Sequence, residues 1–130
     1  ACPALEYDWS ANDYRLFDQA RRELGLDYPE NLSKLLGWPD IIQNNMTLEC
    51  ELVSQGHYLG GHWDSVPLEE RDALRTPSIQ EWRLLFQLDT VASGEFELMF
   101  GDCGRIYFYI RKEDLAARRF GRVWLVLQCS

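Results

Sequence analysis

Histidine and recognisable catalytic motifs are scarce or missing in this sequence. Only His57 and His62 occur among the 130 residues, and none of the four cysteines lies in a C-x-x-C pair. A zinc ribbon and a thioredoxin-type redox motif are therefore excluded. The sequence also lacks G-x-G-x-x-G, a P-loop, G-x-S-x-G and H-E-x-x-H. These absences lower the expectation of an enzyme without removing it.

Long apolar runs are also missing. No run of about 18 apolar residues occurs, so nothing in the sequence is suited to span a membrane. No signal-peptide pattern is present either, and we expect a cytoplasmic protein. The cysteines are Cys2, Cys50, Cys103 and Cys129. In that compartment we expect them to be reduced and mostly buried.

Positive charge is in the minority. The formal net charge is −8, with 21 acidic and 13 basic residues, so nucleic acid is not an expected partner. The charge is uneven, because residues 101–130 carry a net +3 and residues 1–100 a net −11. A basic partner protein would be steered toward the acidic part. Ordinary solubility explains the same charge.

The composition is that of one compact domain, and we expect a single domain over residues 1–130. Hydrophobic residues make up 46% of the chain, enough for a core of its own. Aromatic residues reach 13%, with five tryptophans. So much ring surface indicates either a core built from a few large side chains or an aromatic-lined groove.

Apolar periodicity predicts helices in the first half and strands in the second. The segment 10–25 has the spacing of an amphipathic helix that ends at Gly25. The segment 44–56 fits either a strand or a helix, and its asparagines and Gly56 weakly favour the helix. Residues 67–75 fit a short helix or an ordered loop. Strands are expected near 82–89, 96–100, 105–111 and 122–129, with a short helix over 112–120.

This order predicts an α+β fold with a mixed, mostly antiparallel sheet covered by helices, including 10–25. The strand 105–111 is apolar on both faces, so we expect it to be central and covered on both sides. The connection over 111–121 is long enough for a crossover. The last strand is therefore free to run parallel to 105–111.

The tetrapeptide Gly101-Asp102-Cys103-Gly104 lies between two apolar runs. Glycines supply the positive φ that tight connections need, and an aspartate there hydrogen-bonds nearby backbone amides. A hairpin turn explains the tetrapeptide without catalysis. A nucleophilic Cys103 would need one of the two histidines as its base.

Other polar residues form candidate sites. His57, His62 and Asp64 have no specific metal-site spacing, and we expect no metal or other cofactor. Asp89 ends one strand and Asp102 lies in the turn after the next, so the two carboxylates could meet at one end of the sheet. Two loop-capping aspartates are the alternative.

Three segments together carry a family resemblance: "KLLGWPDIIQ", "WRLLFQLDT" and "MFGDCGRIYFYIRKEDLAARRFGRVWLVLQCS". Taken in this order over residues 32–130, they resemble the YwqG-like family, a bacterial domain of unknown function. The resemblance implies a soluble α+β protein and no particular activity. Family positions map here onto Gly37, Pro39, Gln43, Gln87, Asp89, Gly101, Asp102 and Gly104. Phe100 stands where a tryptophan is typical, and longer members carry an additional N-terminal half.

We therefore predict a non-catalytic protein-binding or regulatory module, with tryptophans such as Trp38 as anchors. Because YwqG-like domains occur near toxin–immunity genes, one version is an immunity-type protein that binds a basic toxin. A homodimer through an aromatic face is a further possibility. The alternative is a small-ligand- or metal-binding protein, or an enzyme, that uses Asp89 and Asp102 at the sheet end. The candidate ligand-binding residues are Trp38, Gln43, Gln87, Asp89 and Asp102.

Overall fold

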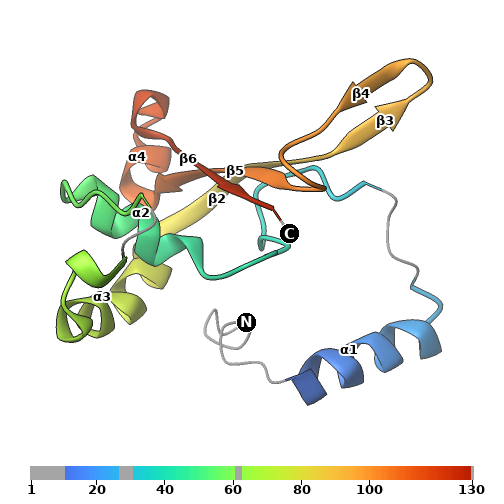
Figure 1. Cartoon of the computed structure of the whole chain (residues 1–130), viewed down its shortest axis with the longest axis horizontal. Helices are drawn as coiled ribbons and strands as arrows, with labels where there is room; N and C mark the ends of the chain where they lie inside the picture. Colours follow the sequence, from blue (N-terminus) through green and yellow to red (C-terminus); the bar gives the residue numbers. More distant parts are fainter. Residues whose placement is uncertain (1–10, 27–30, 61–62, 130) are drawn as a thin grey trace. The chain divides into compact units, whose positions relative to one another are not determined.

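The computed structural model describes residues 11–26, 31–60 and 63–129 (Figure 1). The chain forms two compact units, residues 1–30 and 31–130. Within the described residues, no helix combines the length and the apolar character needed to cross a membrane.

The first unit contains helix α1, Ala11–Glu23, which confirms the helix predicted at 10–25. Its end is closed by hydrogen bonds from Gly25 N to Arg22 O and from Leu26 N to Arg21 O. Gly25 has a φ of +65°, the left-handed conformation that closes many helices.

The second unit is α+β, as predicted, and its main sheet has the strand order β1-β2-β5-β6. The strands are β1 (Lys34–Leu35), β2 (Trp82–Asp89), β5 (Arg105–Arg111) and β6 (Trp124–Gln128). β5 is central, as expected. All neighbouring strands are antiparallel, so the prediction that the last strand could run parallel to 105–111 is wrong.

The connection between β5 and β6 explains this antiparallel pairing. It consists of the short helix α4 (Lys112–Ala116) and the 3₁₀ turn η3 (Phe120–Arg122). These turns return the chain to the end of β5 that it has just left, and Trp124 pairs with Tyr109. A parallel return would need a connection that crosses the whole length of the sheet.

The strand predicted at 96–100 is shorter and lies outside the main sheet. Residues Phe96–Leu98 form β4, which pairs only with β3 (Val91–Ser93) in a separate two-stranded sheet. Figure 1 shows this hairpin extending beyond the ends of β2 and β5. The reason is that the chain continues past the end of β2 before it turns back, so the hairpin has no neighbour on either side.

The turn at residues 101–104 joins this hairpin to β5 and has the geometry expected of a glycine-dependent turn. Gly104 N donates to Phe100 O at 2.7 Å. A Cβ on Gly104 would lie 2.2 Å from that same oxygen, so no other residue fits. Gly101 and Cys103 have φ values of +61° and +56°.

Two helices pack against the main sheet and against each other. α2 (Met46–Ser54) decides the ambiguous segment 44–56 in favour of a helix, and the Asn45 side chain caps it. α3 (Leu68–Glu81) is longer than the short element predicted at 67–75, because it continues through Pro77. The 3₁₀ turn η2 (Trp63–Ser65) precedes it.

Strand β2 does not keep the simple alternation that its sequence predicts. Trp82 and Leu84 face the core, but the register with β5 shifts between Leu84 and Phe86. After this bulge the buried residues are Gln87 and Asp89, rather than Phe86 and Leu88. The bulge therefore turns two polar side chains toward the core side of the sheet.

The opposite, outer face of the sheet is apolar and incompletely covered. Phe86 pairs with Phe108 and Phe108 with Leu125, while Ile106 pairs with both Leu88 and Leu127. Leu125 and Leu127 are 55% and 50% exposed. On β5 itself, Ile106 and Phe108 are half-buried and Ile110 is fully buried, so the expectation that 105–111 is covered on both sides holds only in part.

Candidate functional site

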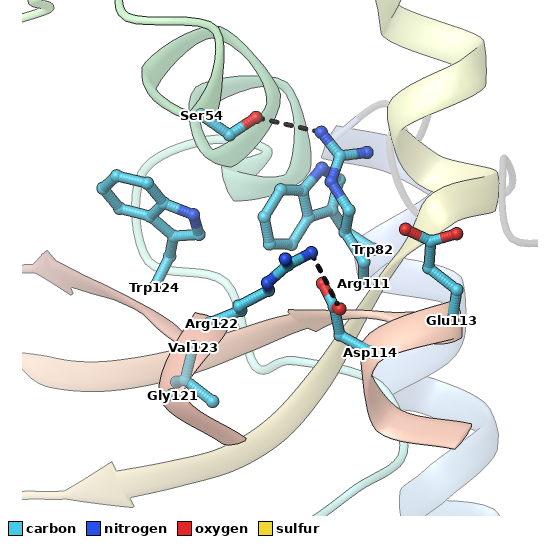
Figure 2. A pocket seen from close by; sticks show the side chains of 9 residues that line it. All are labelled: Ser54, Trp82, Arg111, Glu113, Asp114, Gly121, Arg122, Val123 and Trp124. Atoms are coloured by element: carbon cyan, nitrogen blue, oxygen red, sulfur yellow. Dashed lines mark hydrogen bonds and ion pairs between the residues drawn. The ribbon is translucent and has the colours of Figure 1, made fainter. Parts of the chain in front are cut away.

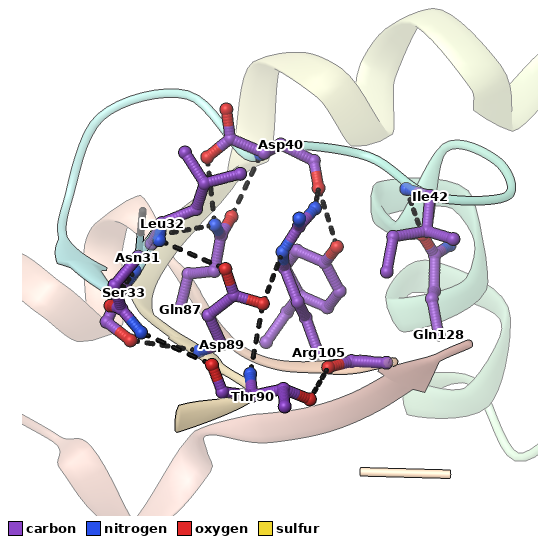
Figure 3. A network of polar contacts seen from close by, with 12 residues as sticks. Asn31, Leu32, Ser33, Asp40, Ile42, Gln87, Asp89, Thr90, Arg105 and Gln128 are labelled. Carbon is purple, nitrogen blue, oxygen red and sulfur yellow. Dashed lines mark hydrogen bonds and ion pairs between the residues drawn. The ribbon is translucent and has the colours of Figure 1, made fainter. Parts of the chain in front are cut away.

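Gln87 lies at the centre of a polar network between the sheet and the segment 31–44 (Figure 3). It is completely buried. Its Oε1 accepts a hydrogen bond from Asp40 N at 2.9 Å, and its Nε2 donates to Leu32 O at 2.7 Å and to Asp40 Oδ2 at 2.8 Å. Three of the four hydrogen bonds that a glutamine can make are thus used within the protein.

Both carboxylate oxygens of Asp89 also accept hydrogen bonds from within the protein. Its Oδ1 accepts from Arg105 Nε at 2.8 Å and from Thr90 N at 3.0 Å, and its Oδ2 accepts from Leu32 N at 3.0 Å. Arg105 Nη1 donates in turn to Asp40 O at 3.0 Å. Asp89 is therefore the partner of an arginine, rather than one of two carboxylates that share a proton.

Gln128 at the end of β6 repeats the role of Gln87. Its Oε1 accepts from Ile42 N and Gln43 N, both at 3.1 Å, and its Nε2 donates to Asn44 O at 2.9 Å. Gln43 Nε2 donates to Cys129 O at 2.6 Å. These contacts hold the segment 31–44 on the sheet, so the network has a structural role.

The remaining predicted site residues, Trp38 and Asp102, are both exposed. Trp38 is 42% exposed on the loop before the buried Pro39. Asp102 is exposed in the turn at 101–104. The structure thus brings Gln87 and Asp89 together, with Gln43 beside Gln128, but in a role that leaves few of their polar atoms for a ligand.

The cysteines and histidines do not form a reactive cluster in the described residues. Cys50 is buried, and burial raises the pKa of its thiol, which keeps it protonated. Cys103 is exposed, which corrects the expectation of mostly buried cysteines, while Cys129 is half-buried and Cys2 lies outside the described residues.

The candidate metal site, His57, His62 and Asp64, does not form a ligand cluster in the described residues. His57 Nε2 lies 3.2 Å from Glu70 Oε1, and His62 is not among the described residues. In the part of the chain that the structure describes, no group of three or more His, Cys, Asp or Glu side chains could hold a metal ion.

A pocket of about 520 Å³ opens between α2, the end of β5 and the start of β6 (Figure 2). This volume is within the range of small-molecule sites. We call it the tryptophan–arginine pocket, after the side chains that dominate its wall: Trp82, Arg111, Arg122 and Trp124, with Ser54 and Asp114.

Arg111 forms a rigid wall of this pocket. Its guanidinium carbon lies 4.7 Å from the centre of the Trp82 ring. It makes two contacts of 3.0 Å with the Glu51 carboxylate, and its Nη2 donates to Ser54 Oγ at 2.9 Å. Burial raises the pKa of Glu51, but hydrogen bonds from Arg111, Trp82 and Gln55 outweigh it, and the pKa is lowered overall. Arg111 is therefore held as a fixed cation.

Arg122 is held more loosely on the other side of the pocket. Asp114 is almost fully buried, and its Oδ1 is paired closely with Arg119 Nε. Arg122 Nη1 reaches the same oxygen at only 3.4 Å, and its side chain is 65% exposed. Figure 2 shows it pointing toward Asp114. Because Arg119 already neutralises Asp114, the Arg122 guanidinium can turn to a ligand at little cost.

Trp124 completes the open side of the pocket. It is 37% exposed, a large fraction for a tryptophan on a strand that is paired with a central neighbour. An exposed indole offers a stacking face and an N–H donor. Together with Arg122, it makes a wall suited to a planar group that carries a negative charge.

Of these pocket residues, the sequence suggested only Trp82, as one of several tryptophan anchors, and no local pattern marks the others as a site. Asp114, Val123 and Trp124 belong to the terminal segment "DLAARRFGRVW", which supported the family resemblance. Arg122 and Arg119 look like ordinary surface charges in a sequence. The fold alone shows that Arg122, on η3, lines the same pocket as Trp82 and Arg111.

Comparison with known proteins gives a family and no function. No curated protein matches the sequence, and no solved structure matches it. A family model described as a domain of unknown function, DUF1963, matches residues 4–129, and the chain therefore belongs to the DUF1963 family.

Proposed function

We propose that this protein is a non-catalytic binding module, and that it binds a planar, acidic ligand in the tryptophan–arginine pocket. The observation that carries the proposal is the contrast between the two arginines of the pocket. Arg111 is fixed by Glu51, Ser54 and Trp82, whereas Arg122 has one long contact to a carboxylate that Arg119 already neutralises.

The wall chemistry selects the ligand class. A planar ring can stack on the exposed Trp124 indole, and its acidic group can pair with the Arg122 guanidinium. Arg111 adds a fixed positive charge behind it. Two acidic side chains line the pocket: Asp114 is neutralised by Arg119, and Glu113 is exposed to solvent, which screens its charge. An aromatic carboxylate is the simplest molecule of this class.

A binding role fits this wall better than catalysis. Catalysis would need a nucleophile or a base that is free to accept a proton. In the pocket, the Ser54 hydroxyl donates to Glu51 O and accepts from Arg111, so both of its polar functions are used. Asp114 and Glu51 are ion-paired, and Glu113, the remaining acid of the lining, is exposed to solvent.

The test is a calorimetric titration of the full chain with indole-3-carboxylate, repeated with the Arg122→Gln and Arg118→Gln variants. Both substitutions remove one exposed positive charge, but only Arg122 lines the pocket. We expect saturable binding by the wild type, about tenfold weaker binding by Arg122→Gln and unchanged binding by Arg118→Gln. Equal weakening in both variants would show a general charge effect and contradict the proposal.

A second candidate function is protein binding through the outer face of the sheet. The six side chains that pair across β2, β5 and β6 on this face are all apolar: Phe86, Leu88, Ile106, Phe108, Leu125 and Leu127. Two sheets can pack face to face through such surfaces. Since the face carries no charge in these positions, a second copy of the chain fits it, as an isologous dimer.

Sedimentation of the full chain at low and high salt tests this candidate against the predicted basic partner. An apolar dimer persists or strengthens with salt, and Leu125→Lys should abolish it. Attraction of a basic protein to the acidic chain, by contrast, weakens with salt. A monomer at every salt and protein concentration would contradict the dimer. From the resemblance stated above, we also infer that the chain is a bacterial protein of the YwqG-like family; its cytoplasmic location stays a prediction.

A further inference from the structure

A second and smaller pocket, of about 210 Å³, lies where α2 and α3 begin. We propose that it binds a small oxyanion, namely a phosphate group. It shares no residue with the tryptophan–arginine pocket, so this inference does not depend on the function proposed above. It is carried by the hydrogen-bonding state of Asn44, Asn45 and Arg71, together with Arg75.

The orientation of the Asn44 amide is fixed by a chain of hydrogen bonds. The backbone N–H groups of Ile42 and Gln43 both donate to Gln128 Oε1. The other end of that amide, Gln128 Nε2, must therefore be the donor to Asn44 Oδ1, at 3.2 Å. Asn44 thus uses its oxygen internally, and its N–H₂ group is the end that a ligand can meet.

Helix α2 fixes the orientation of the Asn45 side-chain amide as well. Its Oδ1 accepts from Thr47 N at 2.8 Å and from Thr47 Oγ1 at 2.7 Å. A backbone N–H can only donate, so the oxygen must face the helix. The Asn45 Nδ2 is buried and has no hydrogen-bond partner in the described part of the chain. A buried unpaired donor costs stability, and a bound acceptor would recover it.

Two arginines of α3 supply the charge. Arg71 Nε is also buried without a partner among the described residues. Arg75 has one nearby acid, Asp72, at 3.5 Å, and both side chains of that pair are more than half exposed. The described lining contains no acidic residue, so no carboxylate within it offsets the two positive charges.

The N-termini of α2 and α3 add to the positive electrostatic potential in the pocket. α2 runs for nine residues from Met46, and α3 runs for 14 residues from Leu68, which itself lines the pocket. The start of α3 has no side-chain cap. Helix N-termini favour anions, and here they support a site that the side chains already define. The pocket therefore offers donors and positive charge in a volume suited to a single small anion.

The experiment measures binding of inorganic phosphate to the full chain at constant ionic strength, by calorimetry and by the NMR shift of the Asn45 side-chain amide. Asn45→Asp is the decisive variant. An aspartate caps α2 as well as asparagine does, so the fold is kept, but an anionic acceptor replaces the donor. We expect saturable binding by the wild type and at least about tenfold weaker binding by Asn45→Asp and by Arg71→Gln.

Lys112→Gln is the matched control, because it removes the same charge from an exposed ion pair with Glu81 at the other end of α3. Its affinity for phosphate should match that of the wild type. A parallel titration with phosphoserine distinguishes a free ion from a phosphorylated group. If only inorganic phosphate binds, the site is for the free ion, and if both bind, it also accepts phosphomonoesters. No saturable binding of either probe, or equal binding by wild type and Asn45→Asp, would overturn the proposal.

Discussion

Gln87 and Gln128 satisfy backbone groups of residues that lie outside the helices and strands. Between them they hold the amides of Asp40, Ile42 and Gln43 and the carbonyls of Leu32 and Asn44. A loop packed on a sheet must find partners for its backbone polar groups. A buried glutamine suits this task because its side chain both donates and accepts.

Replacing Gln87 with leucine should destabilise the protein strongly. The substitution leaves Asp40 N and Leu32 O without a partner in a largely buried environment, and each such group costs about 1–3 kcal/mol. We therefore expect the free energy of unfolding to fall by about 2–4 kcal/mol, as measured by urea denaturation. Gln80→Leu on an exposed position of α3 is the control, with a change near zero. Equal effects of both variants would refute the structural role of Gln87.

Glu51 should make the stability of the protein depend on acidity. In the folded state its pKa lies below the usual 4.5. Its contribution is therefore fully present above pH 4.5 and is lost as the pH falls through the folded-state pKa, because the unfolded chain then binds the proton more readily. Glu51→Gln should be less stable at pH 7 and lose less stability between pH 7 and pH 3. The measurement is thermal unfolding of both proteins between pH 7 and pH 3. If their melting temperatures fell by the same amount over this range, Glu51 would not contribute to the pH dependence.

At the scale of the element, the bulge in β2 decides which face receives the polar residues. The strand and its ends are predictable from the sequence, and so are β5, β6 and α4. The bulge is not, because alternation of Trp82, Leu84, Phe86 and Leu88 predicts one uniform apolar face. Pairing with β5 overrides this pattern, and the alternation in the sequence contains no information about it.

Deletion of Leu85 tests the bulge. Without the extra residue, Leu84 and Phe86 become direct neighbours opposite Tyr109 and Phe108, so Gln87 and Asp89 keep their places on the core side. We expect this variant to keep a cooperative unfolding transition, as followed by circular dichroism. Deletion of Leu88, between Gln87 and Asp89, should abolish that transition, because it turns Asp89 to the outer face and away from Arg105. A Leu85 deletion that unfolds without cooperativity would contradict this reading of the strand.

At the scale of the whole molecule, residues 31–130 form a compact unit that contains a hydrophobic core of its own. Both hydrophobic clusters lie in this unit, one around Met46, Trp82 and Tyr107 and the other around Leu52 and Val66. We therefore expect residues 31–130, produced alone, to unfold cooperatively in urea. A non-cooperative transition, with NMR signals of a disordered chain, would show that residues 1–30 are needed for the fold.

The candidate site could be predicted from the sequence only in part. Asp89 was predicted because it ends a strand and Gln87 because it is a family position, and the structure places both side chains against Leu32. Their role could not be read from the sequence, because it depends on a loop some 50 residues earlier. The tryptophan–arginine pocket was missed for a related reason. Its walls come from α2, β2, β5, α4, η3 and β6, and no local pattern links all of these segments.

The most direct test of ligand binding in the tryptophan–arginine pocket is a map of NMR chemical shifts in the full chain during titration with indole-3-carboxylate. If the ligand binds in this pocket, the signals of the Trp124 indole N–H and the Arg122 Nε–H shift together and saturably, while that of the Gln87 side-chain amide stays unchanged. Shifts centred on Gln87 and its neighbours, with none at Trp124, would show that the polar network is the binding site and the pocket is not.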